Sequence, residues 1–179
     1  RSNSNETTML GLETRLENDR SNVVQVGFPA SFSFNVEQQP FRATIYAFKK
    51  YANDDDKKKK NLVTTRHYAN GVIFTLNGQT NGKEPPRFFN TRGMRYDNIS
   101  SNLLVIVDCS EISPTYIEKL FQNDRERISG STFTNKIKDE IASELAQHPG
   151  LRQFQSEWRK HEVEAILDDD KNTKMLENL

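Results

Sequence analysis

Leu103-Leu104-Val105-Ile106-Val107 is an unbroken apolar run with no polar residue in it. A strand with one face in water alternates apolar and polar residues, whereas a strand covered on both faces stays apolar throughout. The run therefore predicts a central strand. Val72 to Leu76 is a second β-branched and aromatic run, and it also predicts a buried strand. We place both strands near the centre of one sheet.

A hairpin is predicted before these two strands. Phe32, Phe34 and Val36 alternate with polar residues, as in a half-buried strand. Gln38-Gln39-Pro40 is expected to turn the chain, and residues 41–48 then supply the antiparallel partner strand.

Three helices are predicted after Cys109. The first begins at Ser113 as N-cap, with Pro114 in the first helical position. The second opens at Ser131 or Thr132 and ends before Pro149-Gly150. Apolar residues at helical spacing define the buried faces of these two helices: Tyr116, Ile117, Leu120, Phe121, Phe133, Ile137, Ile141 and Leu145. The third begins near Leu151, buries Leu151, Phe154 and Trp158, and is extended to Ile166.

Strands followed by helices predict an α+β fold. We expect a mixed four- to five-stranded sheet with helices packed on one face and a helical C-terminal part. Residues 1–22 are interpreted as a linker or frayed helix, and 23–130 as the α+β domain. Residues 131–179 are interpreted as helices packed on that domain, with a polar tail from about 168. Residues 53–60 combine aspartates and lysines without an apolar residue, which predicts a solvated hairpin tip.

Composition excludes several classes of function. The chain of 179 residues has 25 Lys+Arg and 25 Asp+Glu, so no overall charge favours nucleic acid or anionic lipid. Its one cysteine, Cys109, excludes an internal disulfide framework and a cysteine-rich zinc site, and it is expected to be a buried structural thiol. No stretch approaches the roughly 20 apolar residues that span a bilayer. A reducing, cytoplasmic setting fits these features best.

No self-contained active site is recognisable. The sequence has no P-loop, no nucleophile elbow and no pair of metal-spaced histidines, so we assign no catalytic residue and no metal ligand. The strand ending at Leu76 instead runs into Asn77-Gly78-Gln79-Thr80-Asn81-Gly82-Lys83. A glycine turn with polar neighbours suits a phosphate contact, and it suits an ordinary turn equally well.

Two other classes of function stay open at this stage. Lys83, Arg87, Arg92 and Arg95 lie in a connection that also holds Phe88-Phe89. Such a loop can track phosphates and stack on a base, or its phenylalanines can dock on the core while the arginines face water. Alternatively the last two helices bind a protein partner, for which an exposed Trp158 within an apolar patch is the discriminating observation.

The order of these pieces resembles a known domain. A strand ends in Asn77-Gly78-Gln79-Thr80, a long loop leads to the strand at 103–107, and Asp108-Cys109-Ser110 precedes the segment Leu120–Arg127. This resembles the transducer-type, ribosomal-protein-like domain that follows the nucleotide-binding domain in GHKL ATPases. The similarity covers roughly residues 30–160 and points to the bacterial proteins related to the MutL and MORC groups, some of them in defence against phage.

The resemblance implies a role for the segment after Leu76. Transducers of this family reach the terminal phosphate of ATP with a loop lysine, and topoisomerase-type members use Gln-Thr-Lys. Here Gln79-Thr80 is followed by Asn81-Gly82 before Lys83. The implied phosphate-sensing residues are Gln79, Thr80 and Lys83, with Lys83 stabilising phosphate charge.

The resemblance also implies what the chain lacks. The acidic-Gly-Xaa-Gly segment and glycine-rich lid that bind the nucleotide are missing, so this chain alone is expected neither to bind ATP tightly nor to hydrolyse it. ATP and Mg²⁺ would belong to a neighbouring, upstream nucleotide-binding domain, which is the implied partner. A homodimer and nucleic acid, through Arg87, Arg92 and Arg95, remain open as further partners.

Overall fold

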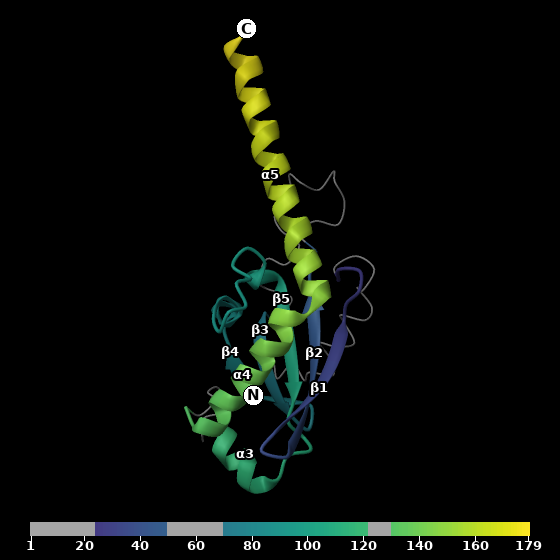
Figure 1. Ribbon diagram of the computed structural model, residues 1–179, viewed down its shortest axis with the longest axis vertical. Coiled ribbons are helices and arrows are strands. Elements are labelled where there is room, and N and C mark those ends of the chain that lie inside the picture. The colour runs from purple at the N-terminus through teal and green to yellow at the C-terminus, as the bar shows by residue number, and fades with distance from the viewer. Residues whose placement is uncertain (1–23, 50–69, 122–129) are drawn as a thin grey trace, which may run out of the picture.

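The computed structural model describes residues 24–49, 70–121 and 130–179. Of the segments discussed above, residues 1–22, residues 53–60 and residues 122–127 lie outside the described part of the chain. The described residues form an α+β fold, as the sequence predicts (Figure 1). The five strands are β1 (Ala30–Val36), β2 (Gln39–Ala47), β3 (Gly71–Leu76), β4 (Gln79–Glu84) and β5 (Leu103–Asp108). Short 3₁₀ turns η2 (Pro86–Asn90) and η3 (Ser100–Asn102) lie between β4 and β5.

The strands form one mixed sheet in the order β1-β2-β5-β3-β4. β3 and β5 pair in parallel, and the other neighbours pair antiparallel. The central position predicted for residues 103–107 is confirmed, because all five of these residues are buried. β1 and β2 form the expected hairpin. Its turn lies at Glu37-Gln38, both with positive φ, so Gln39 and Pro40 belong to β2 rather than to the turn.

The first face of the sheet carries the helix α4 (Thr132–Gln147). Phe133 of α4 packs against Phe41, whose ring stacks on Phe34 with centroids 5.1 Å apart. Of the two helix starts predicted, Ser131 and Thr132, the structure selects Ser131 as N-cap, since its Oγ accepts a hydrogen bond from the Thr134 amide. The second face is buried as well, through residues that alternate with those of the first: Tyr46, Ile73, Leu104 and Ile106.

The helix α3 (Pro114–Leu120) begins as predicted after Ser113, but without a side-chain cap. The Ser113 amide instead donates to Oε1 of Gln39 at 2.8 Å. The contact ties the start of α3 to the first residue of β2.

The last helix, α5 (Pro149–Glu177), is longer than the sequence predicts and reaches past Ile166. Leu151, Phe154 and Trp158 are buried as expected, and the residues from Val163 onward are all exposed. The polar tail expected from about 168 is therefore a helical extension that projects from the body of the fold (Figure 1).

We expect Gly71→Ala to destabilise the fold more than Gly93→Ala. Both glycines have positive φ, +86° and +80°, so a side chain strains each backbone by about 1–2 kcal/mol. A Cβ at Gly71 would also lie 2.2 Å from the backbone oxygen of Glu84, whereas a Cβ at Gly93 meets nothing within 4 Å. Urea unfolding should show a further loss of about 1–3 kcal/mol for Gly71→Ala. Equal losses of unfolding free energy for the two variants would mean that the backbone of β4 at Glu84 moves away from the new Cβ at no cost.

Stability should also depend on pH through His148, the N-cap of α5. Its Nδ1 accepts a hydrogen bond from the Leu151 amide at 3.3 Å, and burial lowers the pKa of the imidazole below 6.5. The imidazole keeps its ordinary pKa of about 6.5 in the unfolded chain and has a lower pKa in the folded state. Between these two values the folded state binds fewer protons than the unfolded chain. The free energy of unfolding should therefore decrease as pH falls from about 6.5 toward the lowered pKa.

The matched control is His148→Asn, which keeps a capping acceptor without titrating in this range. Urea unfolding at neutral and mildly acidic pH should show a weaker decrease for the variant than for the wild type. An unchanged pH dependence would assign the effect to other groups.

Candidate functional site

The carboxyl ends of the two parallel strands lie side by side, and polar residues follow each of them. Thr75 of β3 is the register partner of Asp108 of β5. The Cys109 amide donates to the Thr75 oxygen at 2.8 Å, and the Asn77 amide donates to Oγ of Ser110 at 2.9 Å. Oγ of Ser110 in turn donates to Oδ1 of Asp108. These bonds hold the β3–β4 turn against the end of β5, the position where ligands bind in many sheets with parallel strands.

A polar row continues from this point across all five strands. The registers place Thr80 beside Thr75, Thr75 beside Asp108, Asp108 beside Arg42, and Arg42 beside Ser33. All these side chains lie on the second face of the sheet, because they alternate with the residues that meet α4. We call Ser33, Arg42, Asp108, Thr75 and Thr80 the polar row.

A β-bulge brings Lys83 to the same face. Residues three apart on a regular strand point to opposite faces, so Thr80 and Lys83 would be separated. The register shifts between Phe74 and Thr75, so that Gly82 pairs with Phe74 and Thr80 with Thr75. Asn81 is thereby the extra residue, and Lys83 pairs with Ile73 on the second face, so we count Lys83 with the polar row from here on.

The row combines exposed charges with hydroxyl groups. Arg42, Asp108 and Lys83 are exposed, while Thr75 is buried and its hydroxyl donates to the Val107 oxygen. Asp108 already accepts bonds from the Ser110 amide and hydroxyl. Arg42 in β2 and Lys83 in β4 are three strands apart, so Lys83 is the cation nearer to Thr80. A cation near a threonine hydroxyl can bind an anion such as phosphate.

Cys109 adjoins this row but takes no part in its chemistry. Burial, and then the nearby Asp108, raises the pKa of the thiol far above its ordinary value. A thiol that stays protonated is a poor nucleophile, which agrees with the structural role predicted for it.

The segment predicted to be a phosphate-sensing loop is an edge strand. Asn77 and Gly78 both have positive φ and form a tight two-residue turn, and Gln79–Glu84 then pair with β3 as β4. Gln79 is exposed, and it pairs with Leu76 on the first face. Of the three candidates, the structure thus brings Thr80 and Lys83 together and leaves Gln79 on the other side.

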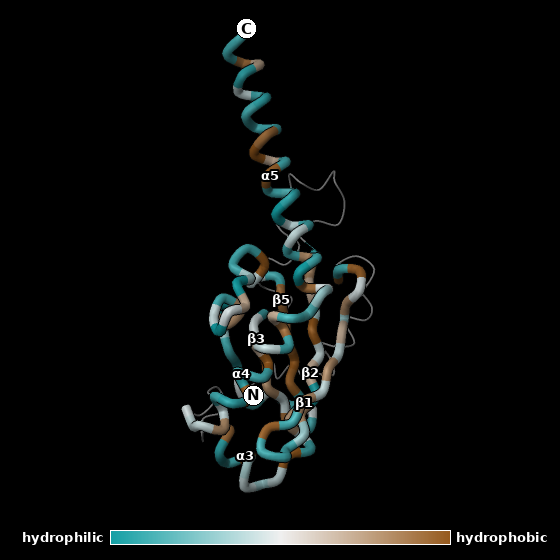
Figure 2. Tube along the Cα trace, viewed as in Figure 1, coloured by the Kyte–Doolittle hydropathy of each residue, from teal (hydrophilic) through white to brown (hydrophobic). Residues whose placement is uncertain are grey.

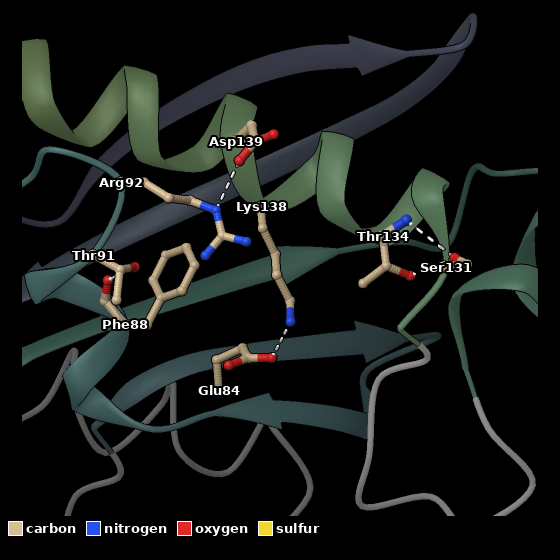
Figure 3. Close-up of polar contacts among 8 residues, drawn as sticks. All are labelled: Glu84, Phe88, Thr91, Arg92, Ser131, Thr134, Lys138 and Asp139. Atoms are coloured by element: carbon tan, nitrogen blue, oxygen red, sulfur yellow. Dashed lines mark hydrogen bonds and ion pairs between the residues drawn. The ribbon is translucent and has the colours of Figure 1, made fainter.

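The basic connection after β4 is anchored rather than extended (Figure 3). Phe88 and Phe89 are buried, so these rings dock on the core and are not available to stack on a base. Nε of Arg92 lies 2.7 Å from Oδ1 of Asp139 on α4, and its guanidinium lies over the Phe88 ring. Arg87 and Arg95 are exposed. Like Lys83, they form no ion pair with any other described residue, so Arg92 alone of the four basic residues is paired there.

Trp158 argues against the interaction surface that the sequence left open. Its side chain is 7% exposed and packs edge-on against Phe154, and its indole N–H donates to Glu162. The tryptophan therefore belongs to the core and forms no exposed apolar patch.

The described part of the chain contains no group of three or more His, Cys, Asp and Glu residues that could hold a metal ion. No helix among residues 24–49, 70–121 and 130–179 is both long and apolar enough to cross a membrane. No protein-family model matches the chain, and no curated protein matches it. The resemblance to GHKL transducers thus rests on the motifs quoted above.

Sequence reasoning missed Arg42 and Asp108 as site residues. Arg42 lies in a strand whose sequence predicts only the partner of a hairpin, and its charged neighbour in the row, Asp108, is more than sixty positions away. The signal that could have found Asp108 is the pair of apolar runs: if they are parallel neighbours, a site is expected at the residues that follow them, Asn77 and Asp108.

We expect Ser110→Ala to destabilise the fold by about 1 kcal/mol, since the Asn77 amide and Asp108 both lose a hydrogen-bond partner. The control is Ser113→Ala, because the Ser113 side chain makes no capping bond and should be close to neutral. Urea unfolding compares the two. A larger loss for Ser113→Ala would show that the Ser110 bonds do not hold the β3–β4 turn.

Proposed function

We propose that this chain is the non-catalytic transducer domain of a larger GHKL-type ATPase, with Lys83 contacting the terminal phosphate of a nucleotide held by a neighbouring domain. The observation that carries the proposal is the bulge at Asn81, which puts Thr80 and Lys83 on one face together with Arg42. A bulge costs strand regularity, and proteins use it to re-aim side chains next to functional sites.

The chemistry follows from the charges in this row. An ammonium group at Lys83 offsets the negative charge that develops on a transferred phosphoryl group, and the Thr80 hydroxyl can donate a hydrogen bond to it. Arg42 supplies a second cation two strands away from β3, beside Asp108. ATP and Mg²⁺ would be bound by the neighbouring domain, so this chain's role is contact and coupling in a cytoplasmic enzyme.

A path for coupling leads from Lys83 to the helical layer. The next residue, Glu84, points to the first face, where Oε1 lies 2.5 Å from Nζ of Lys138 on α4 (Figure 3). These two side chains are 22% and 16% exposed, so water screens their attraction only partly. A pull on β4 by bound phosphate would reach α4 through this pair, and it would shift the population of α4 positions.

The test uses the protein with its native upstream region. We expect Lys83→Ala to lower its ATPase rate by about 10²-fold, as for loss of a cation that stabilises transition-state charge. The isolated chain should be inactive with or without the substitution.

Arg87→Ala is the matched control, because Arg87 is an exposed cation on η2 and lies outside the polar row. It should leave the rate close to that of the wild type. A Lys83→Ala enzyme as active as the wild type would refute the phosphate contact, and absence of ATPase activity from the wild-type protein would refute the GHKL assignment.

A further inference from the structure

The outer half of α5 extends beyond the body of the fold. Trp158 is the last buried residue of the helix, and residues 163–179 are all exposed. The helical part of this segment, residues 163–177, is roughly 22 Å long at about 1.5 Å per residue. An isolated helix of this length is only marginally stable in water, so most such helices gain their stability from packing. The projection is visible in Figure 1, above the sheet.

A cluster of three aliphatic side chains lies on this projecting length, apart from Leu176 and Leu179 near its end. Val163, Ile166 and Leu167 are 55%, 62% and 53% exposed. They form the hydrophobic segment in the middle of an otherwise mainly hydrophilic stretch (Figure 2). At 100° per residue they lie on a different side of the helix from Leu151, Phe154 and Trp158, which dock on the body.

Val163 and Ile166 belong to a longer exposed stripe with alternating spacings of four and three residues. That spacing keeps side chains on one side of a helix and is the pattern by which two helices pair. The stripe consists of Arg152, Ser156, Arg159, Val163, Ile166, Asp170, Thr173 and Glu177. Every residue of the stripe is exposed, including the three that precede the projecting part.

The charges of the stripe are arranged as a mirror about its apolar centre. The cations, Arg152 and Arg159, lie toward the body, and the anions, Asp170 and Glu177, lie at matching distances toward the tip. A parallel pair of such helices would face like charges against each other. An antiparallel pair faces each cation against an anion, with aliphatic residues in the middle.

We propose that the outer half of α5 pairs antiparallel with α5 of a second copy of this chain. Val163 packs against the partner's Ile166, Arg159 meets the partner's Asp170, and Arg152 meets the partner's Glu177. Two-fold symmetry repeats each contact, as in other isologous interfaces. In the described part of the chain, neither Arg159 nor Asp170 takes part in an ion pair of its own.

Among the described residues, the side of α5 that would meet the partner's tip is uncovered. The partner's tip would lie beside Arg152 and Ser156, which are exposed although their part of α5 is docked. Nε of Arg152 donates to the Ala146 oxygen at 2.8 Å, which holds that side chain near the start of α5. The two bodies would lie at opposite ends of the paired helices. This proposal is independent of the ATPase assignment.

The experiment measures association of the purified chain by sedimentation velocity at low ionic strength over a wide concentration range. The wild type should show a monomer–dimer equilibrium. Arg159→Asp and Asp170→Arg each place like charges opposite one another twice, and each should weaken the dimer by at least about tenfold. An equimolar mixture of these two variants restores both ion pairs and should associate like the wild type, as should the double variant.

Matched controls reverse a charge on another side of the same helix. Lys171→Asp and Asp168→Arg lie off the stripe and should leave association unchanged. All substituted positions are exposed, and circular dichroism verifies folding of each variant. A wild type that stays monomeric, or a mixture that fails to associate, would overturn the proposal. Association of the wild type but not of the double variant would also overturn it, because that would exclude the antiparallel register.

Discussion

Parallel pairing of β3 with β5 is the contact on which the rest of this structure depends. The two strands are the most apolar in the chain, and each pairs on its other side with one antiparallel strand, β3 with β4 and β5 with β2. Burial of both faces gives the pairing its stability, because apolar side chains leave water on each side of the same backbone. The pairing also brings Thr75 next to Asp108 and so aligns the polar residues that follow the strands.

The polar row shows how register, rather than residue type alone, builds a site. Without the extra residue Asn81, Lys83 would lie on the face that α4 covers, and Glu84 would lie on the second face. The bulge reverses both at once. As a result, Lys83 lies on the second face and Glu84 lies on the face that α4 covers, where it pairs with Lys138. A transducer needs this kind of connection between an exposed contact and the helical layer, which is why the proposal for Lys83 rests on the bulge.

Prediction from sequence succeeded where a local pattern carried a strong signal. The α+β class, the hairpin at β1 and β2, the central β5 and the start of α4 at Ser131 or Thr132 were all predicted correctly. β4 was missed, because Gln79–Glu84 has no apolar residue to alternate, and only pairing with β3 makes it a strand. The full length of α5 was missed for a similar reason, since beyond Ile166 the helix has no buried face whose period could be read.

The amino-acid sequence by itself determined where the buried strands and helix faces lie, because a segment's hydrophobic period depends only on its own residues. It also determined that Cys109 could form no internal disulfide. The tertiary structure alone decided that β3 and β5 are neighbours, that Phe88 and Phe89 dock on the core, and that Arg42 shares a face with Lys83. Those outcomes depend on pairing between residues far apart in the chain, where the register of several strands, and not any single segment, sets which side chains meet.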